Sequence, residues 1–541
     1  MAYESTQVKE VVERAVGHQW SIPEFQRGFV WKPTQVRDLA ESLWLNYPIG
    51  SLLVWNSQGP TEERIARDAQ RPSLWVVDGQ QRATALSILF GRKPYWWPSA
   101  DEWDKTLKRY DIRFDVHTKE PPFFLVANAG IRKAKSDRYL SLSRLLTLDT
   151  ERAADQQTLM QLAKDIKVQG FCDGLDAMED YARLDRVRKT RDKEVVTITI
   201  DQELEEVVEI FSRLNSKGTR VTEADIYLGI VAARAPGWVR DSFLPFLRDL
   251  AQAGFDLNPN LLFRCLTGIG AGKVRFKDVA DDFWDAACIQ PAWEKTKKAW
   301  SGLISRFRTV GVLSNDPMPT EAALVTLIAL QHRFPDEPFE PCHYWFLQAS
   351  RFARYSGSGT TSIDEDLRDV NEATSAADAV HRLTKRFPHD TPLEAEDFLR
   401  DYSDTRFGRF LLYLLAYDRQ AVDWDSAGHR IGFDGSNVLA DFRPQWHHVF
   451  PRKYLEGKAP EERINALANI AVIGPAINIR ISDKDPMAYI QKYGITAEKL
   501  RQQFIESDIT ITPAAGYEQW LIQRADRLAK AGNDYLEKFR P

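Results

Sequence analysis

The spacing of apolar residues predicts helices and strands in alternation along the first part of the chain. Within residues 4–18, apolar residues recur at every third or fourth position, which predicts an amphipathic helix. Residues 33–48 carry a second helical pattern that opens with a proline, a residue favoured in the first turn of helices. The run Gly50–Trp55 is short and apolar, and it predicts a strand.

The clearest passage from strand to helix is the segment SLWVVDGQQRATALSILFG. An apolar strand over Leu74–Val77 ends at Asp78-Gly79, and apolar residues at helical spacing follow over Gln80–Leu89. Further strand-like runs lie within residues 106–127. We therefore expect a mixed α/β domain over residues 1–235.

The pattern becomes mainly helical after this domain and changes again near the end of the chain. Segments such as AALVTLIALQHRF have helical spacing, which predicts an α-helical middle region over residues 236–400. Beyond it, QWHHVFP and LANIAVIGPAIN predict short strands and a helix, which we assign to a terminal domain over residues 401–541. The fold class predicted is thus multidomain α+β, and a length of 541 residues fits several domains.

Composition indicates a globular protein of a reducing compartment. Hydrophobic residues make up 43% of the chain and charged residues 28%, enough to bury large cores. The four cysteines form no CxxC pair, which favours neither a disulfide framework nor a zinc ribbon. The charged start MAYESTQVKEVVERAV does not resemble a signal peptide, and no run of eighteen apolar residues occurs. We expect a cytoplasmic protein with no membrane partner.

Net charge does not identify the protein as a nucleic-acid binder. The value is -5, although a nuclease with several domains can confine positive charge to a cleft. One basic run, RLDRVRKTRDK over Arg183–Lys193, is either a solvated loop or a loop that contacts phosphates. The sequence leaves these two alternatives open.

Two adjacent histidines in QWHHVFP carry the strongest candidate chemistry. Hydrolysis of a phosphodiester needs a base for the attacking water and a cation that neutralises charge on the phosphate. An imidazole titrates near neutral pH, and a second imidazole with an amide oxygen can hold the metal. A strand over Ile470–Ile473 and a helix starting near Asn478 would return that asparagine to the histidines. We predict His448 as the general base, with Asn469 bracing its loop and His447 and Asn478 as metal ligands.

This constellation resembles the HNH domain that closes GmrSD-type modification-dependent restriction enzymes. The resemblance rests on WHHVFP, on Asn469 and Asn478 nine positions apart, and on the later ISDKDPMAYI, and it covers residues 445–490. The asparagine spacing is also similar to that in HNH domains of CRISPR effector nucleases. Such domains often have Asp or Glu before the base, where this chain has His447. The expected cofactor is a divalent metal, Mg²⁺ in the first place, with Mn²⁺, Ni²⁺ or Zn²⁺ suited to the imidazole.

Three polar clusters in the first domain stand in the order IPEFQRGFVW, VVDGQQRATAL and FSRLNSKGTRVTEADI. In the second cluster a strand ends at an Asp-Gly turn, and the helix that follows presents backbone N–H groups and Arg82 to an anion. In the third, Gly218 permits a positive φ and polar neighbours offer donors for a phosphate. Each cluster alone also fits an ion pair, a cap or a turn. No Walker sequence is present, so a nucleotide site must be of another kind.

Together the clusters resemble the amino-terminal domain of the GmrSD and SspE group of phage-defence proteins, over about residues 5–235. The fold of that group is similar to the ParB and sulfiredoxin superfamily, and the resemblance implies NTP hydrolysis at DGQQR and sensing of modified DNA. The residues assigned to NTP hydrolysis are Asp78, Gln80, Gln81 and Arg82. Those assigned to nucleotide binding are Gln26, Arg27, Asp78, Gly79, Gln81, Arg82, Asn215, Ser216, Lys217, Gly218 and Thr219. Those assigned to sensing are Phe25, Gln26, Arg27 and Trp31.

The leading hypothesis is a modification-dependent DNA endonuclease of antiviral defence, whose NTP turnover gates the HNH site. The expected partners are double-stranded DNA with phosphorothioate or glucosyl modification and an NTP, with GTP, ATP and UTP not distinguished. A homo-oligomer is compatible with the sequence. Two alternatives stay open: a nucleotide-dependent sensor or partner-binding module with an inactive HNH fold, and an RNase that uses the same site.

Overall fold

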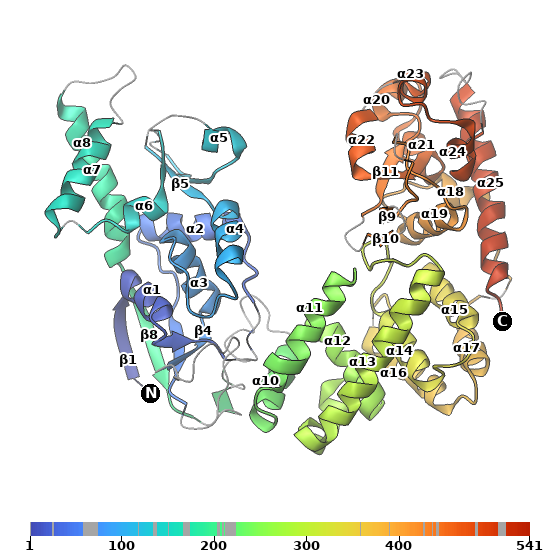
Figure 1. The fold of residues 1–541 in the computed structure, drawn as a ribbon, viewed down its shortest axis with the longest axis horizontal. Coiled ribbons are helices and arrows are strands. Elements are labelled where there is room, and N and C mark those ends of the chain that lie inside the picture. Colours follow the sequence, from blue (N-terminus) through green and yellow to red (C-terminus); the bar gives the residue numbers. More distant parts are fainter. Residues whose placement is uncertain are drawn as a thin grey trace. The chain divides into compact units, whose positions relative to one another are not determined.

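The computed structural model of the protein divides into two compact units, Met1–Phe243 and Leu244–Pro541 (Figure 1). Apart from residues 236–243, the predicted helical middle lies in the second unit together with the predicted terminal domain. The division into three domains stays a prediction. The structure describes residues 2–23, 26, 28–57, 74–116, 118, 120–133, 138–149, 151–165, 174–202, 206, 207, 210, 223–357, 359–388, 390–425, 428–434, 437–439, 443–481, 485–506 and 516–541.

A mixed five-stranded sheet forms the centre of the first unit, with strand order β1-β8-β3-β4-β2. Strand β8 runs antiparallel to β1 and parallel to β3, and β3 runs antiparallel to β4. The strands are β1 (Ala2–Gln7), β2 (Trp20–Ser21), β3 (Leu52–Trp55), β4 (Leu74–Asp78) and β8 (Glu194–Ile200). A second sheet has the order β6-β5-β7, from β5 (Ile112–Asp115), β6 (Phe124–Val126) and β7 (Tyr139–Ser141).

Helices cover this sheet and share its core. Residues Val11, Val36 and Leu86, each from a different helix, are at most 1% exposed within a core cluster that also includes sheet residues. The helical elements are α1 (Val8–Val16), α2 (Pro33–Trp44), α3 (Gln80–Leu89), α4 (Ala100–Arg109), α5 (Ala129–Lys133), α6 (Leu142–Leu146), α7 (Ala153–Asp165), α8 (Gly174–Arg188), η2 (Lys189–Asp192), α10 (Glu223–Arg234) and η3 (Val239–Phe243).

The helix predicted over residues 4–18 was wrong in its first part. Residues up to Gln7 form β1, and the helix begins only at Val8. The strand pairs with β8, and the buried hydroxyls of Thr6 and Thr197 lie 2.9 Å apart. Because its partner strand lies far along the chain, local apolar spacing could not reveal this pairing.

The basic run after Arg183 is not a loop but the end of α8 and the short helix η2. Arg183 donates hydrogen bonds to the carbonyl oxygens of Val116 and Thr118. The guanidinium of Arg186 lies 4.1 Å from the ring centroid of Trp44, a cation–π contact. These arginines therefore hold the first unit together, which favours a structural role for the run.

All described elements from Leu244 to Asp418 are helical, as the apolar spacing predicts. Short strands and helices follow and pack with them in the second unit (Figure 1). The first set comprises α11 (Leu244–Gln252), α12 (Pro259–Ala271), η4 (Phe276–Asp278), η5 (Asp281–Trp284), α13 (Ala286–Thr309), α14 (Ala323–Arg333), α15 (Glu340–Arg351), α16 (Gly359–Glu372), α17 (Ala376–Thr384), α18 (Ala395–Leu399) and α19 (Arg406–Asp418). The second comprises β9 (Phe433–Asp434), β10 (Asn437–Val438), β11 (Gln445–His448), α20 (Arg452–Leu455), α21 (Glu461–Ile464), η6 (Leu467–Asn469), β12 (Ile470–Ile473), α22 (Pro475–Ile481), α23 (Pro486–Lys492), α24 (Ala497–Gln502) and α25 (Tyr517–Lys538).

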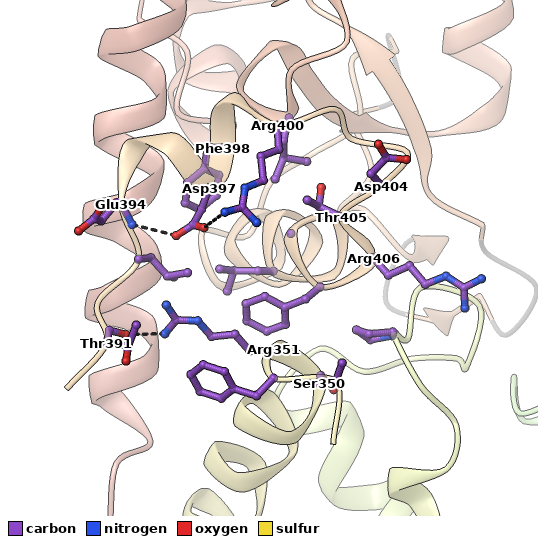
Figure 2. A pocket seen from close by; sticks show the side chains of 18 of the residues that line it. Ser350, Arg351, Thr391, Glu394, Asp397, Phe398, Arg400, Asp404, Thr405 and Arg406 are labelled. Atoms are coloured by element: carbon purple, nitrogen blue, oxygen red, sulfur yellow. Dashed lines mark hydrogen bonds and ion pairs between the residues drawn. The ribbon is translucent and has the colours of Figure 1, made fainter. Parts of the chain in front are cut away.

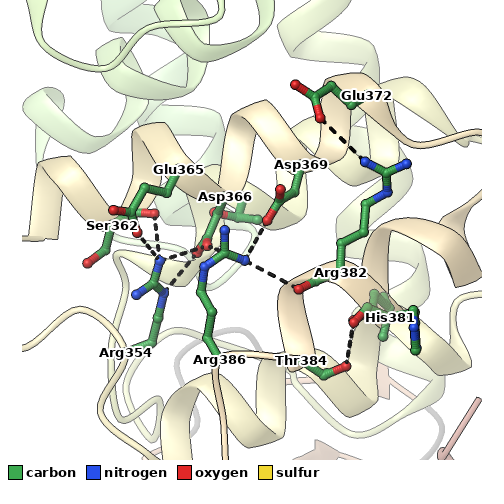
Figure 3. A network of polar contacts seen from close by, with 12 residues as sticks. Arg354, Ser362, Glu365, Asp366, Asp369, Glu372, His381, Arg382, Thr384 and Arg386 are labelled. Carbon is green, nitrogen blue, oxygen red and sulfur yellow. Dashed lines mark hydrogen bonds and ion pairs between the residues drawn. The ribbon is translucent and has the colours of Figure 1, made fainter.

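A buried ionic network joins the end of α15 to α16 and to the segment after α17 (Figure 3). The carboxylate of Asp366 lies 3.0 Å from Arg354 and 3.8 Å from Arg386, and it accepts a hydrogen bond from the hydroxyl of Tyr355. Burial raises the pKa of Asp366 in spite of the hydrogen bonds from Arg354 and Tyr355. The cost of desolvating the carboxylate is thus large, and the network depends on every partner being present.

Asp366→Ala is expected to lower the free energy of unfolding by about 3–5 kcal/mol, because two guanidinium groups lose their buried counter-ion. Glu365→Ala is the matched control, since Glu365 binds Arg354 through a side chain that is 43% exposed. An exposed ion pair contributes about 0–1 kcal/mol. Urea denaturation of the parent and both variants measures the difference, and equal effects of the two substitutions would contradict this assignment.

His343 in α15 ties the helical region to the C-terminal helix α25. Its side chain is fully buried, and its Nε2 lies 3.3 Å from the hydroxyl of Tyr535. The ring of Phe539 stands perpendicular to the imidazole at 4.6 Å between centroids. Burial lowers the pKa of His343 to about 3, so the imidazole is neutral at physiological pH.

Acidification from pH 6.5 to pH 4 is expected to destabilise the protein by up to about 3 kcal/mol through His343. The unfolded chain takes up the proton below about pH 6.5, whereas the folded imidazole with its pKa of about 3 does not. Stability from this group is therefore complete above pH 6.5 and falls as pH falls. His343→Gln should show a smaller loss than the parent in urea unfolding over this range, and the same loss in both proteins would refute the effect.

Candidate functional site

Two short strands and a helix form the framework around the adjacent histidines. Strand β11 pairs antiparallel with β12, with His447 opposite Ala471 and His448 opposite Ile470. Helix α22 follows β12 directly and contacts β11. The helix begins at Pro475, earlier than predicted, because proline fits the first turn of a helix. Asn478 consequently lies one turn inside the helix and faces the strand that carries the histidines.

His447 contacts Asn478 from the buried face of β11. Its Nδ1 lies 3.0 Å from Oδ1 of Asn478, and the side chain is 4% exposed. The rings of Trp424 and Tyr489 stand nearly perpendicular to the imidazole, each at 5.6 Å between centroids. Burial lowers the pKa of His447 to about 4, so the imidazole is neutral at physiological pH.

The donor set of His447 and Asn478 fits a divalent cation. Two ligands at right angles on a metal with bonds of about 2.1 Å are separated by about 3.0 Å, which is the distance between the two donor atoms. A metal ligand must be the neutral imidazole, which burial favours here. Nε2 of His447 is buried, and no described group hydrogen-bonds to it. Among the described residues no group of three His, Cys, Asp or Glu side chains is suited to a metal. Water or phosphate oxygens can complete the coordination of a cation held by His447 and Asn478.

His448 points to the other face of β11, as alternation along a strand requires. Its Nε2 lies 3.2 Å from Oδ1 of Asn465, and the ring of Tyr402 stands at 90° to the imidazole, 5.5 Å away. Burial lowers the pKa of His448, although the side chain is less buried than that of His447. A neutral, partly accessible imidazole is suited to accept a proton from water.

Asn469 braces the chain on both sides of this site. Its side chain is fully buried, its Oδ1 accepts the N–H of Phe450 at 2.9 Å, and its Nδ2 donates to the carbonyls of Phe450 and Ile464. These partners are backbone groups of the loop after β11 and of the segment before η6. Asn469 therefore holds the loop that follows His448.

Arg524 in α25 supports the start of β12 and was not predicted from the sequence. The guanidinium is fully buried and donates to the carbonyl oxygens of Ala468, Ile470 and Gln503. Burial lowers the pKa of Arg524 to about 9. Its signal in the sequence is a lone arginine on the apolar face of a helix, in line with buried Leu521 and Leu528.

A cavity of about 950 Å³ lies beside the loop that carries Tyr402 (Figure 2). The loop residues Arg400 and Thr405 line it, and Arg351 lines the opposite side with its guanidinium bound to the carbonyl oxygens of Thr391 and Pro392. Neither histidine of the candidate site is among the lining residues. The cavity is thus separate from the site, although the same loop borders both.

In the first unit, strand β4 ends at Asp78 and α3 begins at Gln80, with Gly79 between them at φ 90°. A side chain at Gly79 would be strained by this φ and would lie 2.3 Å from the side chain of Leu52. Gly79 has no side chain that could cap α3, and the N-terminus of a helix is an electrostatically favourable place for an anion. This geometry is the one expected at the DGQQR motif.

Arg82 joins this turn to a neighbouring loop. It forms an ion pair with Asp78 at 3.0 Å and donates to the carbonyl oxygen of Ile49 at 3.0 Å. A Cβ at the next residue, Gly50, would lie 2.2 Å from Nη1 of Arg82. The close approach of the guanidinium therefore needs a glycine there.

The two glutamines and the polar cluster before them lie at the same end of β4. The side chain of Gln81 accepts the N–H of Val30 at 2.9 Å and donates to the carbonyl of Gly28 at 2.9 Å. Gln26 donates to the carbonyl of Val77 at 2.8 Å, and Gln80 is buried. The structure thus brings Gln26 close to the DGQQR turn. Gln26 and residues of this turn were predicted from the sequence to bind the nucleotide.

The remaining predicted residues of the first unit are placed only in part. Trp31 packs against the core, and its carbonyl oxygen accepts the hydroxyl of Tyr110 at 2.6 Å. Phe25, Arg27 and the run Asn215–Thr219 lie outside the described residues. Their assignments to sensing and to nucleotide binding stay predictions.

Comparison with known proteins agrees with the motifs of the first unit. An uncharacterized protein of Methanocaldococcus jannaschii, MJ0686, is 20% identical over 545 residues, which cover 91% of this chain and 87% of the relative. Within the described parts of the chain, no helix is both long and apolar enough to cross a membrane. Residues 8–232 match the family model of the GmrSD restriction endonuclease, N-terminal domain. This part of the chain is therefore similar to the N-terminal domain of the GmrSD restriction endonuclease, which supports a GmrSD-like restriction protein.

Proposed function

We propose that this protein is a modification-dependent DNA endonuclease of antiviral defence, with an HNH nuclease site in the second unit. The observation that supports the proposal is the distance of 3.0 Å between Nδ1 of His447 and Oδ1 of Asn478. His448 is the next residue along the same strand. Strand, strand and helix stand in the order of a ββα-metal motif. The family match supports DNA as the substrate.

In this proposal His448 takes the proton from the attacking water, and Asn469 fixes the loop behind it. His447 and Asn478 hold a divalent cation, Mg²⁺ in the first place, which neutralises charge on the phosphate and the departing oxygen. The buried rings around His447 keep its imidazole neutral and fixed in direction. Burial also favours the neutral form of His448, the form that can act as a base.

The first unit is proposed to bind and hydrolyse an NTP in a ParB-like fold and to sense the modification. Support comes from Gly79 at the uncapped start of α3 and from Arg82 beside it, an arrangement suited to phosphate. A nuclease must be kept inactive toward the DNA of its own cell. Binding of an NTP and binding of modified DNA can each shift the equilibrium between an inactive and an active conformation. Coupling of this kind would make cleavage depend on both ligands.

The proposal is tested by cleavage of plain, phosphorothioated and glucosylated duplex DNA by the full chain. Each substrate is offered with Mg²⁺ or Mn²⁺ and with GTP, ATP, UTP or no nucleotide. We expect strong cleavage of one modified DNA, raised or lowered by one NTP. Equal cleavage of all DNAs under all conditions would refute sensing and gating, cleavage of RNA alone would indicate an RNase, and no cleavage would indicate an inactive sensor module.

A further inference from the structure

We propose that Ile479 inserts between two base pairs of the bound duplex from its minor groove, an inference that rests on the proposed nuclease function. Ile479 lies in α22 directly after Asn478, whose side chain contacts His447 at the candidate site. It is 80% exposed, more than any other large hydrophobic residue that the structure describes. Single apolar side chains are common on protein surfaces, but this one lies beside the residues that are proposed to act on the DNA backbone.

The exposed face of α22 is apolar apart from one cation. Residues four positions apart lie on the same side of a helix, and this spacing relates two pairs of exposed residues, Pro475 with Ile479 and Ala476 with Arg480. Helix α22 contains no acidic residue, so none of its side chains repels a phosphate. Exposed faces of helices are usually polar. An apolar face with a positive charge suits a DNA groove, in which sugars and base edges lie between two rows of phosphates.

The fold holds α22 firmly from below and at both ends. Ile477 anchors the opposite side of the helix in the core, where its side chain is fully buried. Before the helix, the carboxylate of Asp423 accepts the N–H of Gly474 at 3.0 Å. At its end, the hydroxyl of Tyr493 donates to the carbonyl oxygen of Arg480 at 2.7 Å. An inserted side chain must overcome the stacking of two base pairs, and it therefore needs a rigid support of this kind.

The position of Ile479 next to Asn478 fits the dimensions of the groove. Consecutive Cα atoms are ~3.8 Å apart, whereas the minor groove of B-DNA is ~6 Å wide. A phosphate of one strand that lies at Asn478 therefore brings Ile479 to the groove beside the same strand. Proteins that insert an isoleucine, leucine or methionine between base pairs do so from the minor groove and bend the duplex. Ile479 consequently enters a step next to the cleaved phosphate.

The test measures base unstacking with 2-aminopurine, whose fluorescence rises when stacking is lost. The base is placed at successive positions of plain and modified duplexes, which are bound by the full chain without a divalent metal. We expect a rise at one position with the parent, no rise with Ile479→Ser, and a rise again with Ile479→Leu, which restores an apolar side chain. Affinity for the duplex should fall about 10-fold in Ile479→Ser, because the buried contact of the isoleucine is lost.

Ile522→Ser is the matched control, because Ile522 is 41% exposed on α25 in the same unit. This variant should bind and unstack the duplex like the parent. The salt dependence of binding separates insertion from a contact with phosphate. The slope of log affinity against log salt should be the same in Ile479→Ser and the parent, whereas the loss of one phosphate contact reduces it by about 1. Thermal unfolding should give the same Tm for all variants, since both isoleucines are exposed.

The outcomes separate this inference from the proposed function. Equal fluorescence in the parent and Ile479→Ser, or a smaller salt slope in Ile479→Ser, would overturn the insertion, while cleavage by the parent would still support the nuclease. A parent that binds and unstacks DNA without cutting it supports the insertion and contradicts the nuclease. A parent that does not bind DNA contradicts both.

Discussion

His448→Ala is expected to lower kcat for DNA cleavage by about 10²- to 10⁴-fold, the usual contribution of a general base. Binding of DNA and the free energy of unfolding should change little, because His448 is partly accessible and its neighbours are held by other contacts. Single-turnover cleavage of the preferred modified duplex measures the rate, and a binding assay without metal measures affinity. The rate at saturating metal should stay low, since the missing group is the base and not a ligand.

His381→Ala serves as the control for this prediction. His381 lies exposed on α17, away from β11 in the same unit, and its backbone carbonyl is bound to Thr384 (Figure 3). This variant should cleave like the parent. Full activity of His448→Ala would show that another residue activates the water.

The part of the candidate site that the sequence predicts is local in the chain. His447, His448, Asn469 and Asn478 lie within one short stretch, and a strand pair followed by a helix is enough to bring them together. The apolar runs predict the two strands, whereas the helix begins at Pro475 and not near Asn478 as predicted. The local sequence is therefore enough to predict that these side chains come close together.

The supporting residues could not be predicted because their partners lie far along the chain. Tyr402 packs against His448 from the loop after α18, and Arg524 reaches the carbonyls around Asn469 from the C-terminal helix. Apolar spacing gives the buried face of a helix but not the element on which that face packs. The sequence therefore indicates a charged residue on an apolar face without revealing which backbone it supports.

In the first unit, too, the sequence predicted structure formed by neighbouring residues but not the contacts between distant segments. The turn from β4 into α3 at Gly79 was predicted from the residues themselves. The contacts of Gln81 with the loop of Val30 and of Arg82 with the loop of Ile49 were not, because each joins segments more than thirty residues apart. These contacts make the DGQQR turn the point where two loops are fixed, so a ligand bound there can act on both.

His447→Asp is expected to retain cleavage and to move the metal preference toward Mg²⁺, whereas His447→Ala should cut at least about 100-fold more slowly. A carboxylate is the harder ligand and suits Mg²⁺ and Mn²⁺, whereas imidazole favours Ni²⁺ or Zn²⁺. Loss of a ligand removes transition-state stabilisation worth several kcal/mol. Cleavage rates with Mg²⁺, Mn²⁺, Ni²⁺ and Zn²⁺ measure both effects, and an unchanged order of metals in His447→Asp would contradict a ligand role.

Thermal unfolding separates a ligand at His447 from a residue that is merely buried. The side chain is 4% exposed, so an aspartate there becomes a buried charge that destabilises the protein until a cation pairs with it. Mg²⁺ should then raise the Tm of His447→Asp more than that of the parent. His343→Asp is the matched control, because His343 is equally buried but far from Asn478, so Mg²⁺ should not restore its stability. Equal rescue of both variants would mean that the cation acts on the fold in general and not at the histidine pair.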